Sequence, residues 1–235
     1  MIRFSLPHIQ ADGGRSRYSP PTRLVSVENT SNLGGGRVWP LGAVEDVSRA
    51  ARGLGLATHM DGARLLNAVV ASGTPARAYA GLVDSLWIDF SKGLGAPVGA
   101  CLAGSRAFIE EAWRYKQALG GAMRQAGIIA AGGVYALRHH VSRLAEDHEN
   151  AKVFARGIAG LRGVSLNPDH VETNIVIFDV AGTGHTAQAL ADRLLAAANV
   201  RLSVMGETRL RAVTHLDVSR KQVDAAVEAM AAVTA

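Results

Sequence analysis

An acid, an arginine and a lysine follow two neighbouring apolar segments of this 235-residue sequence. Asp61 and Arg64 come just after the apolar segment 56–60, and Lys92 comes shortly after the mostly apolar segment 83–90. Both segments are short and bounded by glycine-containing turns, as expected for strands of a buried parallel sheet. Ligands of open α/β sheets bind at the carboxyl ends of the strands, so these three side chains are expected to lie close together.

A lysine amine and a carboxylate at one sheet edge suit pyridoxal phosphate chemistry. Lys92 would form a Schiff base with this cofactor, and Asp61 would keep the pyridine nitrogen protonated so that the ring withdraws electrons. Spacing by itself leaves other interpretations open, because a lysine after a strand is commonly a solvated loop residue and an aspartate before a helix is commonly a cap. A nucleotide site at residues 91–95 is a weaker alternative, since the full glycine-rich phosphate-binding pattern is absent.

The elements that must position these residues alternate between strand and helix. In the first part of the chain we expect strands at 24–27, 56–60, 83–90 and 99–103, and helices at 41–54, 63–71, 75–80 and 105–118. Residues 122–160 should form long helices that lead to strands at 173–180, 200–204 and 210–214 and helices at 185–198 and after Ser219, which forms a capping box with Gln222. Residues 1–20 are expected to be irregular. The pattern predicts an α/β fold with a mostly parallel sheet in a large domain, residues 1–150, and a small C-terminal α/β domain, residues 151–235.

Composition narrows the class of protein. The chain is 48% hydrophobic and 19% charged, which is ordinary for a globular protein. A net charge of +5 without a basic run predicts no nucleic-acid partner. We read no apolar run of about 18 residues and no leader, so neither a membrane span nor a signal peptide is expected, and a cytoplasmic location is. The single cysteine, Cys101, argues against disulfides and is expected to be a small buried core residue. No metal site is predicted.

Five sequence blocks resemble, in order and in approximate separation, the threonine aldolases, which belong to the aspartate-aminotransferase-like (fold type I) pyridoxal phosphate enzymes. The likeness covers about residues 20–235, and the blocks are 28–36, 59–68, 91–103, 119–127 and 211–217. The resemblance implies pyridoxal 5′-phosphate as cofactor and a fold type I large domain that is only partly present. It also implies a homo-oligomer, a dimer or tetramer, that cleaves a β-hydroxy-α-amino acid of the threonine, allo-threonine or phenylserine type into glycine and an aldehyde.

The resemblance also implies a role for individual residues. Lys92 is the expected catalytic Schiff-base lysine, Asp61 the partner of the pyridine nitrogen, and Arg64, one turn into the following helix, the neighbour of the cofactor's phenolic oxygen. Arg211 is expected to bind the substrate α-carboxylate in a bidentate manner, although Arg209 on the same strand face could take this role. For Arg64, an ion pair with Asp61 is the structural alternative.

Two departures from the family pattern affect this interpretation. Ser31 stands where these enzymes commonly carry a histidine near the substrate β-hydroxyl, and a serine can form hydrogen bonds there but cannot act as an imidazole base. The family's amino-terminal part, with its phosphate-binding helix start, has no equivalent in residues 1–19, and each lost charge-assisted hydrogen bond would cost about 1.5–3 kcal/mol. Two alternatives therefore stay open: a related pyridoxal phosphate β-eliminating lyase, and a non-catalytic truncated chain.

Several further polar residues have weaker functional interpretations. His59 shares the face of Asp61 and is as consistent with a core histidine bonded to backbone as with a catalytic one. Arg124, in a glycine-rich stretch, could contact the cofactor, a neighbouring subunit or an acid on another helix. His139 and His140 are expected to lie on a solvated helix face.

Overall fold

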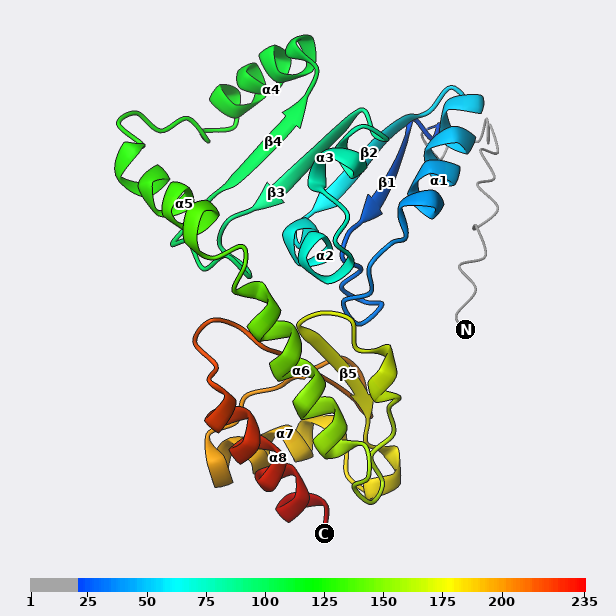
Figure 1. The fold of residues 1–235 in the computed structure, drawn as a ribbon, viewed down its shortest axis with the longest axis vertical. Coiled ribbons are helices and arrows are strands. Elements are labelled where there is room, and N and C mark those ends of the chain that lie inside the picture. Colours follow the sequence, from blue (N-terminus) through cyan, green and yellow to red (C-terminus); the bar gives the residue numbers. More distant parts are fainter. Residues whose placement is uncertain (1–20) are drawn as a thin grey trace.

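The computed structural model describes residues 21–235 and contains two sheets, each with helices packed against it (Figure 1). The first sheet has the strand order β1-β2-β3-β4, with β1 at Leu24–Glu28, β2 at Ala57–Gly62, β3 at Ser85–Asp89 and β4 at Ala100–Gly104. The first three strands are parallel, and β4 runs antiparallel to β3. The prediction of an α/β fold with a mostly parallel sheet is confirmed, while the expectation for residues 1–20 lies outside the described residues.

Helices α1 to α5 accompany this sheet, and we call the sheet and these helices the N-terminal part. They are α1 at Leu41–Gly53, α2 at Leu65–Ser72, α3 at Ala76–Ala80, α4 at Arg106–Ala118 and α5 at Gly127–His139. The buried residues of α1 recur every three or four positions, so one face of this helix packs on the sheet. One core cluster joins this helix to the three parallel strands and to α2 and α3: Val27, Val44, Val47, Met60, Leu65, Tyr79 and Leu86. Ser105 caps α4 as predicted, since its side chain accepts a hydrogen bond from the Phe108 N–H.

The second sheet and helices α6 to α8 form what we call the C-terminal part. Its antiparallel strands are ordered β5-β7-β6, with β5 at Ile175–Asp179, β6 at Ser203–Val204 and β7 at Arg209–Val213. The helices are α6 at Leu144–Ile158, α7 at Ala187–Ala198 and α8 at Arg220–Thr234, with single 3-10 turns at Pro168–His170 and Ala181–Thr183. Residues of all three helices and of β5 and β7 share one apolar core. The predicted capping box of Ser219 and Gln222 is present at the start of α8.

Helix α6 joins the two parts. Its first residue, Leu144, packs in a small cluster with Leu94, Ala96 and Ala136 of the N-terminal part, whereas its later residues belong to the core of the C-terminal part. Residue 150 lies inside this helix, and the domain boundary there stays a prediction. Figure 1 shows that the arrowheads of β1 and β3 point toward the C-terminal part. The carboxyl ends of the parallel strands therefore face the second sheet.

One prediction about the core is wrong. Cys101 is exposed, because it lies on β4, whose residues are all exposed. This strand pairs with β3 on one side only and forms the edge of the sheet. Its apolar composition resembles that of a central strand, so the sequence alone placed it in the interior. Among the described residues, the helices are too short or too polar for any of them to cross a membrane.

Candidate active site

Asp61 lies near the carboxyl end of β2, where it is in register with Glu28 of β1 and Trp87 of β3. The side chain is half-buried, and its Oδ1 accepts a hydrogen bond from the Ala63 N–H at 3.0 Å. The next residue must be small, because a Cβ at Gly62 would collide with the carbonyl oxygen of Trp87. This tight turn holds the carboxylate at the end of the strand where the sequence pattern predicts it.

Lys92 lies in the turn that follows β3. Its Nζ forms an ion pair with Asp89 Oδ2 at 3.0 Å and lies 5.1 Å from the centre of the Trp87 ring. Burial raises the pKa of Asp89, but hydrogen bonds from Ser91 and from Lys92 outweigh it, so this pKa lies below its usual value. The Asp89 carboxylate is thus ionised and forms the ion pair with Lys92. Because the Lys92 side chain is 41% exposed, its amine is open to a ligand.

Arg64 lies among charged side chains of both signs. It is the N-cap residue of α2, which corrects the expectation that it lies one turn into that helix. Burial and then the charge of Arg211 lower its pKa, whereas three acids raise it: Glu28, Asp89 and Asp61. None of the ion pairs among residues 21–235 joins Arg64 to Asp61. The ion pair that was the structural alternative for Arg64 is therefore not formed. The electrostatic interactions place Arg64 within range of charged groups from both sheets.

Arg211 reaches this region from β7 of the second sheet. Its Nη1 donates to Asn32 Oδ1 at 2.8 Å, and its Nη2 donates to Ser203 Oγ at 3.4 Å. Its Nε is buried and lacks a hydrogen-bond partner among the described residues. Arg209, in contrast, is exposed and lies in register with Asp179 of β5. Arg211 is therefore the arginine of this strand that faces the predicted site.

The loop after β1 carries Ser31 and Asn32. Ser31 is half-buried; its N–H donates to the Arg37 carbonyl at 2.9 Å, and its own carbonyl accepts from the Gly36 N–H at 2.8 Å. Arg37 also forms an ion pair with Glu172 of the C-terminal part, with Nε and Oε1 3.3 Å apart. The loop is thereby tied across the two parts, and both Ser31 and Asn32 lie where the two parts meet.

Other expected positions differ in detail. His59 Nδ1 lies 2.8 Å from Ser85 Oγ, so its partner is a side chain on the neighbouring strand rather than backbone. His139 is exposed as expected, but His140 is half-buried, and its Nδ1 lies 2.6 Å from the Leu94 carbonyl oxygen. Arg124 is exposed. The comparison of residues 1–19 with a phosphate-binding segment lies outside the described residues.

Sequence reasoning missed the residues that hold the predicted ones. Asp89 ends its strand three residues before Lys92, and this spacing was a usable signal for an ion pair. Asn32 contacts Arg211 across 179 positions of the chain, and His215 contacts the Lys92 carbonyl across 123. These two contacts have no local signature, because they depend on how the two parts pack together.

The family follows from a direct comparison. A model of the β-eliminating lyase family matches residues 6–181, which is most of the chain. The chain belongs to the β-eliminating lyase family. It is 38% identical over 210 residues to low-specificity L-threonine aldolase 1 of Arabidopsis thaliana, and 42% identical over 202 residues to the low specificity L-threonine aldolase of Escherichia coli K12. These alignments cover 88% and 86% of this chain but 58% and 57% of the relatives. This β-eliminating lyase family chain thus spans little more than half the length of the curated relatives it matches.

Solved structures give the same fold. A putative L-allo-threonine aldolase from Listeria monocytogenes superposes with a TM-score of 0.76 at 22% identity, covering 93% of this chain and 63% of that one. The threonine aldolase of Leishmania major gives a TM-score of 0.72 at 18% identity, covering 96% of this chain and 65% of that one. At such identities the likeness establishes the fold alone, and the predicted fold type I architecture is confirmed.

Proposed function

We propose that this chain is part of a pyridoxal 5′-phosphate-dependent carbon–carbon lyase. Its substrates would be β-hydroxy-α-amino acids of the threonine, allo-threonine or phenylserine type, which it would cleave to glycine and an aldehyde. One observation carries the proposal: the gathering of Asp61, Arg64, Lys92 and Arg211, from both sheets, at the carboxyl ends of the parallel strands. Membership of the β-eliminating lyase family and the likeness to low-specificity L-threonine aldolases support it.

The side chains present suit this cofactor. The Asp61 carboxylate can hold a proton on the pyridine nitrogen, the Arg64 guanidinium can bind the anionic phenolic oxygen, and the Lys92 amine can bind the aldehyde carbon. When bound, pyridoxal phosphate supplies an electron-withdrawing ring that accepts the electron pair left at the α-carbon of the amino acid. Asp89 keeps the Lys92 amine near the end of β3, where the register of the sheet also places Asp61 close by.

The substrate would be held from the C-terminal part. The planar guanidinium of Arg211 is suited to a bidentate grip on the α-carboxylate. Its contact with Asn32 fixes the orientation of the guanidinium group. The buried Nε–H is a donor without a partner among the described residues. Repulsion between Arg64 and Arg211 favours an anionic ligand near both. Ser31 can form a hydrogen bond with a substrate hydroxyl group.

We further propose that the protein is a cytoplasmic homo-oligomer, a dimer or tetramer. Every residue of α4 is exposed or half-buried. Large apolar side chains are also exposed to solvent in and near the segment that leads from α4 to α5. The exposed fractions are 83% for Leu119, 63% for Met123 and 88% for Ile128. Apolar surface of this kind commonly marks a protein interface. A single cysteine leaves no pair for a disulfide within the chain, which supports a reducing compartment.

The test is the near-visible absorbance of the chain mixed with pyridoxal phosphate. Wild type should give a band that Lys92→Ala abolishes. Lys116→Ala is a matched control, because the Nζ of Lys116 also lies over a tryptophan ring, 4.8 Å from the centre of Trp113, but on α4 and not in the turn that follows β3. Glycine release from L-threonine or phenylserine then identifies an aldolase.

Two other results would contradict the proposal in different ways. A wild type without any band would favour the non-catalytic alternative. A normal band without glycine release would favour the β-eliminating lyase alternative.

A further inference from the structure

Two imidazole rings hold the turn that carries Lys92. His215 Nε2 lies 2.7 Å from the Lys92 carbonyl oxygen, and His140 Nδ1 lies 2.6 Å from the Leu94 carbonyl oxygen. A carbonyl oxygen can only accept a hydrogen bond, so each of these ring nitrogens must carry a proton and donate it. The two rings come from different parts of the molecule, since His140 follows α5 and His215 follows β7.

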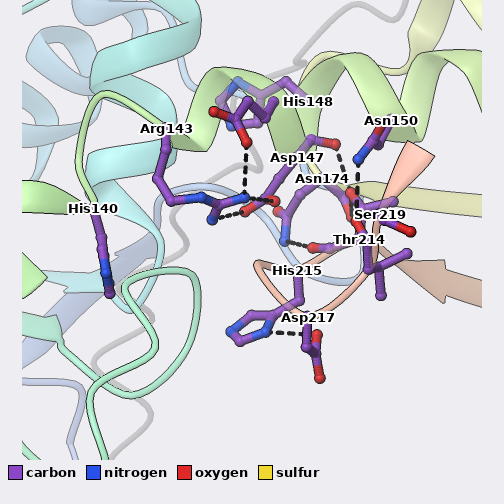
Figure 2. A network of polar contacts seen from close by, with 12 residues as sticks. His140, Arg143, Asp147, His148, Asn150, Asn174, Thr214, His215, Asp217 and Ser219 are labelled. Atoms are coloured by element: carbon purple, nitrogen blue, oxygen red, sulfur yellow. Dashed lines mark hydrogen bonds and ion pairs between the residues drawn. The ribbon is translucent and has the colours of Figure 1, made fainter. Parts of the chain in front are cut away.

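The orientation of the His215 ring is set by its other nitrogen. Its Nδ1 lies 2.9 Å from Asp217 Oδ1, a contact visible in Figure 2. The Asp217 carboxylate and the Lys92 carbonyl both accept hydrogen bonds, so the two contacts form together when each ring nitrogen carries a proton. The ring then donates at both ends and cannot rotate without losing both hydrogen bonds. The Asp217 side chain is 75% exposed, so it orients the ring from the surface.

The residue before His215 is held by two hydrogen bonds. Thr214 is buried, and its Oγ1 donates to the Asp147 carbonyl at 2.6 Å while its N–H donates to the Asn174 carbonyl at 3.0 Å. Figure 2 shows Thr214, the residue before His215, packed against Asn174 beside α6. His215 is thus anchored to the C-terminal part.

The turn itself is shaped to receive this loop. Gly95 has φ +65° and donates its N–H to the Lys92 carbonyl at 2.9 Å, so that oxygen accepts both from within the turn and from His215. A Cβ at Gly95 would overlap the side chain of Leu216. The loop between β7 and α8 therefore packs directly on the turn that carries Lys92.

We propose that His215, oriented by Asp217, is a positioning residue for Lys92. It holds the Lys92 backbone from the C-terminal part, and so determines where the Lys92 amine lies relative to Asp61. The inference rests on the proposed function in giving Lys92 a catalytic role. The anchoring contact itself does not depend on that function and is tested separately.

The first test follows amide hydrogen exchange in the full chain without cofactor. His215→Phe keeps a ring of similar size but removes the donor, whereas His215→Gln can place an amide N–H near the position of Nε2. Exchange in residues 92–96 should be about tenfold faster in His215→Phe and close to wild type in His215→Gln. His139→Phe, at an exposed neighbour of His140, should leave this segment unchanged. Equal exchange in all four proteins would overturn the proposal.

The second test adds pyridoxal phosphate and measures the concentration that gives half of the near-visible band. His215→Phe should raise it about tenfold, and His215→Gln should restore it. Should His215→Phe fail to fold, Asp217→Asn at an exposed position should still raise it about threefold. If the band forms in wild type and the half-saturating concentration of pyridoxal phosphate is the same in these variants, the positioning role is overturned. A wild type without a band would instead contradict the proposed function, and the exchange experiment would still decide the contact.

Discussion

Arg143→Ala removes one half of a buried ion pair at the start of α6. Arg143 Nη2 lies 2.7 Å from Asp147 Oδ1, and its Nη1 donates to Oδ2 at 3.2 Å, so the pair is bidentate (Figure 2). The side chain of Asp147 is 0% exposed and that of Arg143 is 19% exposed. Burial lowers the pKa of Arg143, but the neighbouring carboxylates of Asp147 and Glu146 raise it above its ordinary value. The Arg143 guanidinium is therefore charged, and it is the cation that the buried Asp147 side chain contacts.

The cost follows from what the substitution leaves behind. Without Arg143, the Asp147 carboxylate stays in the interior with no cation, which costs about 3–5 kcal/mol. For a chain of this size, about 1 kcal/mol lowers the melting temperature by about 2–4 °C, so the expected loss is about 6–20 °C. Arg49 is the matched control, because it pairs with Glu45 and Asp46 while its side chain is 68% exposed. Arg49→Ala should cost at most about 1 kcal/mol.

Thermal and urea unfolding followed by circular dichroism measure both changes. The double variant Arg143→Met with Asp147→Leu should recover most of the stability, since it leaves no buried charge. The carbonyl of Asp147 also accepts from Thr214, next to His215, so Arg143→Ala should in addition weaken cofactor binding. A melting temperature for Arg143→Ala as close to wild type as that of Arg49→Ala would refute the reasoning.

Two further predictions concern the substrate and pH. Arg211→Ala should raise the KM for the amino acid by at least about thirtyfold without weakening cofactor binding, because losing one partner of a buried charged pair costs about 2–5 kcal/mol. Arg209→Ala, at an exposed position, should change neither in steady-state kinetics, and cofactor loss in Arg211→Ala would contradict the assignment. Burial and then Lys152 lower the pKa of His148 from 6.5 to about 4, so the folded protein keeps this ring neutral while the unfolded chain takes up a proton between these values. The resulting stabilisation is complete above pH 6.5 and is lost as the pH falls toward 4. His148→Gln retains a partner for Asn67, whose side chain lies 3.1 Å from His148 Nε2. In urea unfolding, this variant should lose about 2–3 kcal/mol less stability than wild type between pH 7 and pH 4.5. Wild-type and variant stabilities that change in parallel with pH would exclude this role for His148.

Local sequence determined the elements and half of the site. Apolar spacing predicts α1 and the parallel strands, and the polar residues Ser105 and Ser219 mark two helix starts, because each of these signals depends on neighbours within one or two turns. The nearness of Asp61 and Lys92 is equally predictable. Asp61 lies near the carboxyl end of β2 and Lys92 follows β3, and adjacent parallel strands end at the same edge of the sheet.

The tertiary structure decided between alternatives that the sequence pattern does not distinguish. Arg209 and Arg211 lie on the same face of one strand, and they are distinguished by the exposure of Arg209 and by the contact of Arg211 with Asn32. Cys101 lies in an apolar strand whose exposure depends on its place at the sheet edge. His215 becomes a partner of Lys92 only because the two parts pack against each other around α6. Periodicity describes which face of an element a residue occupies, whereas packing between distant segments determines what that face meets.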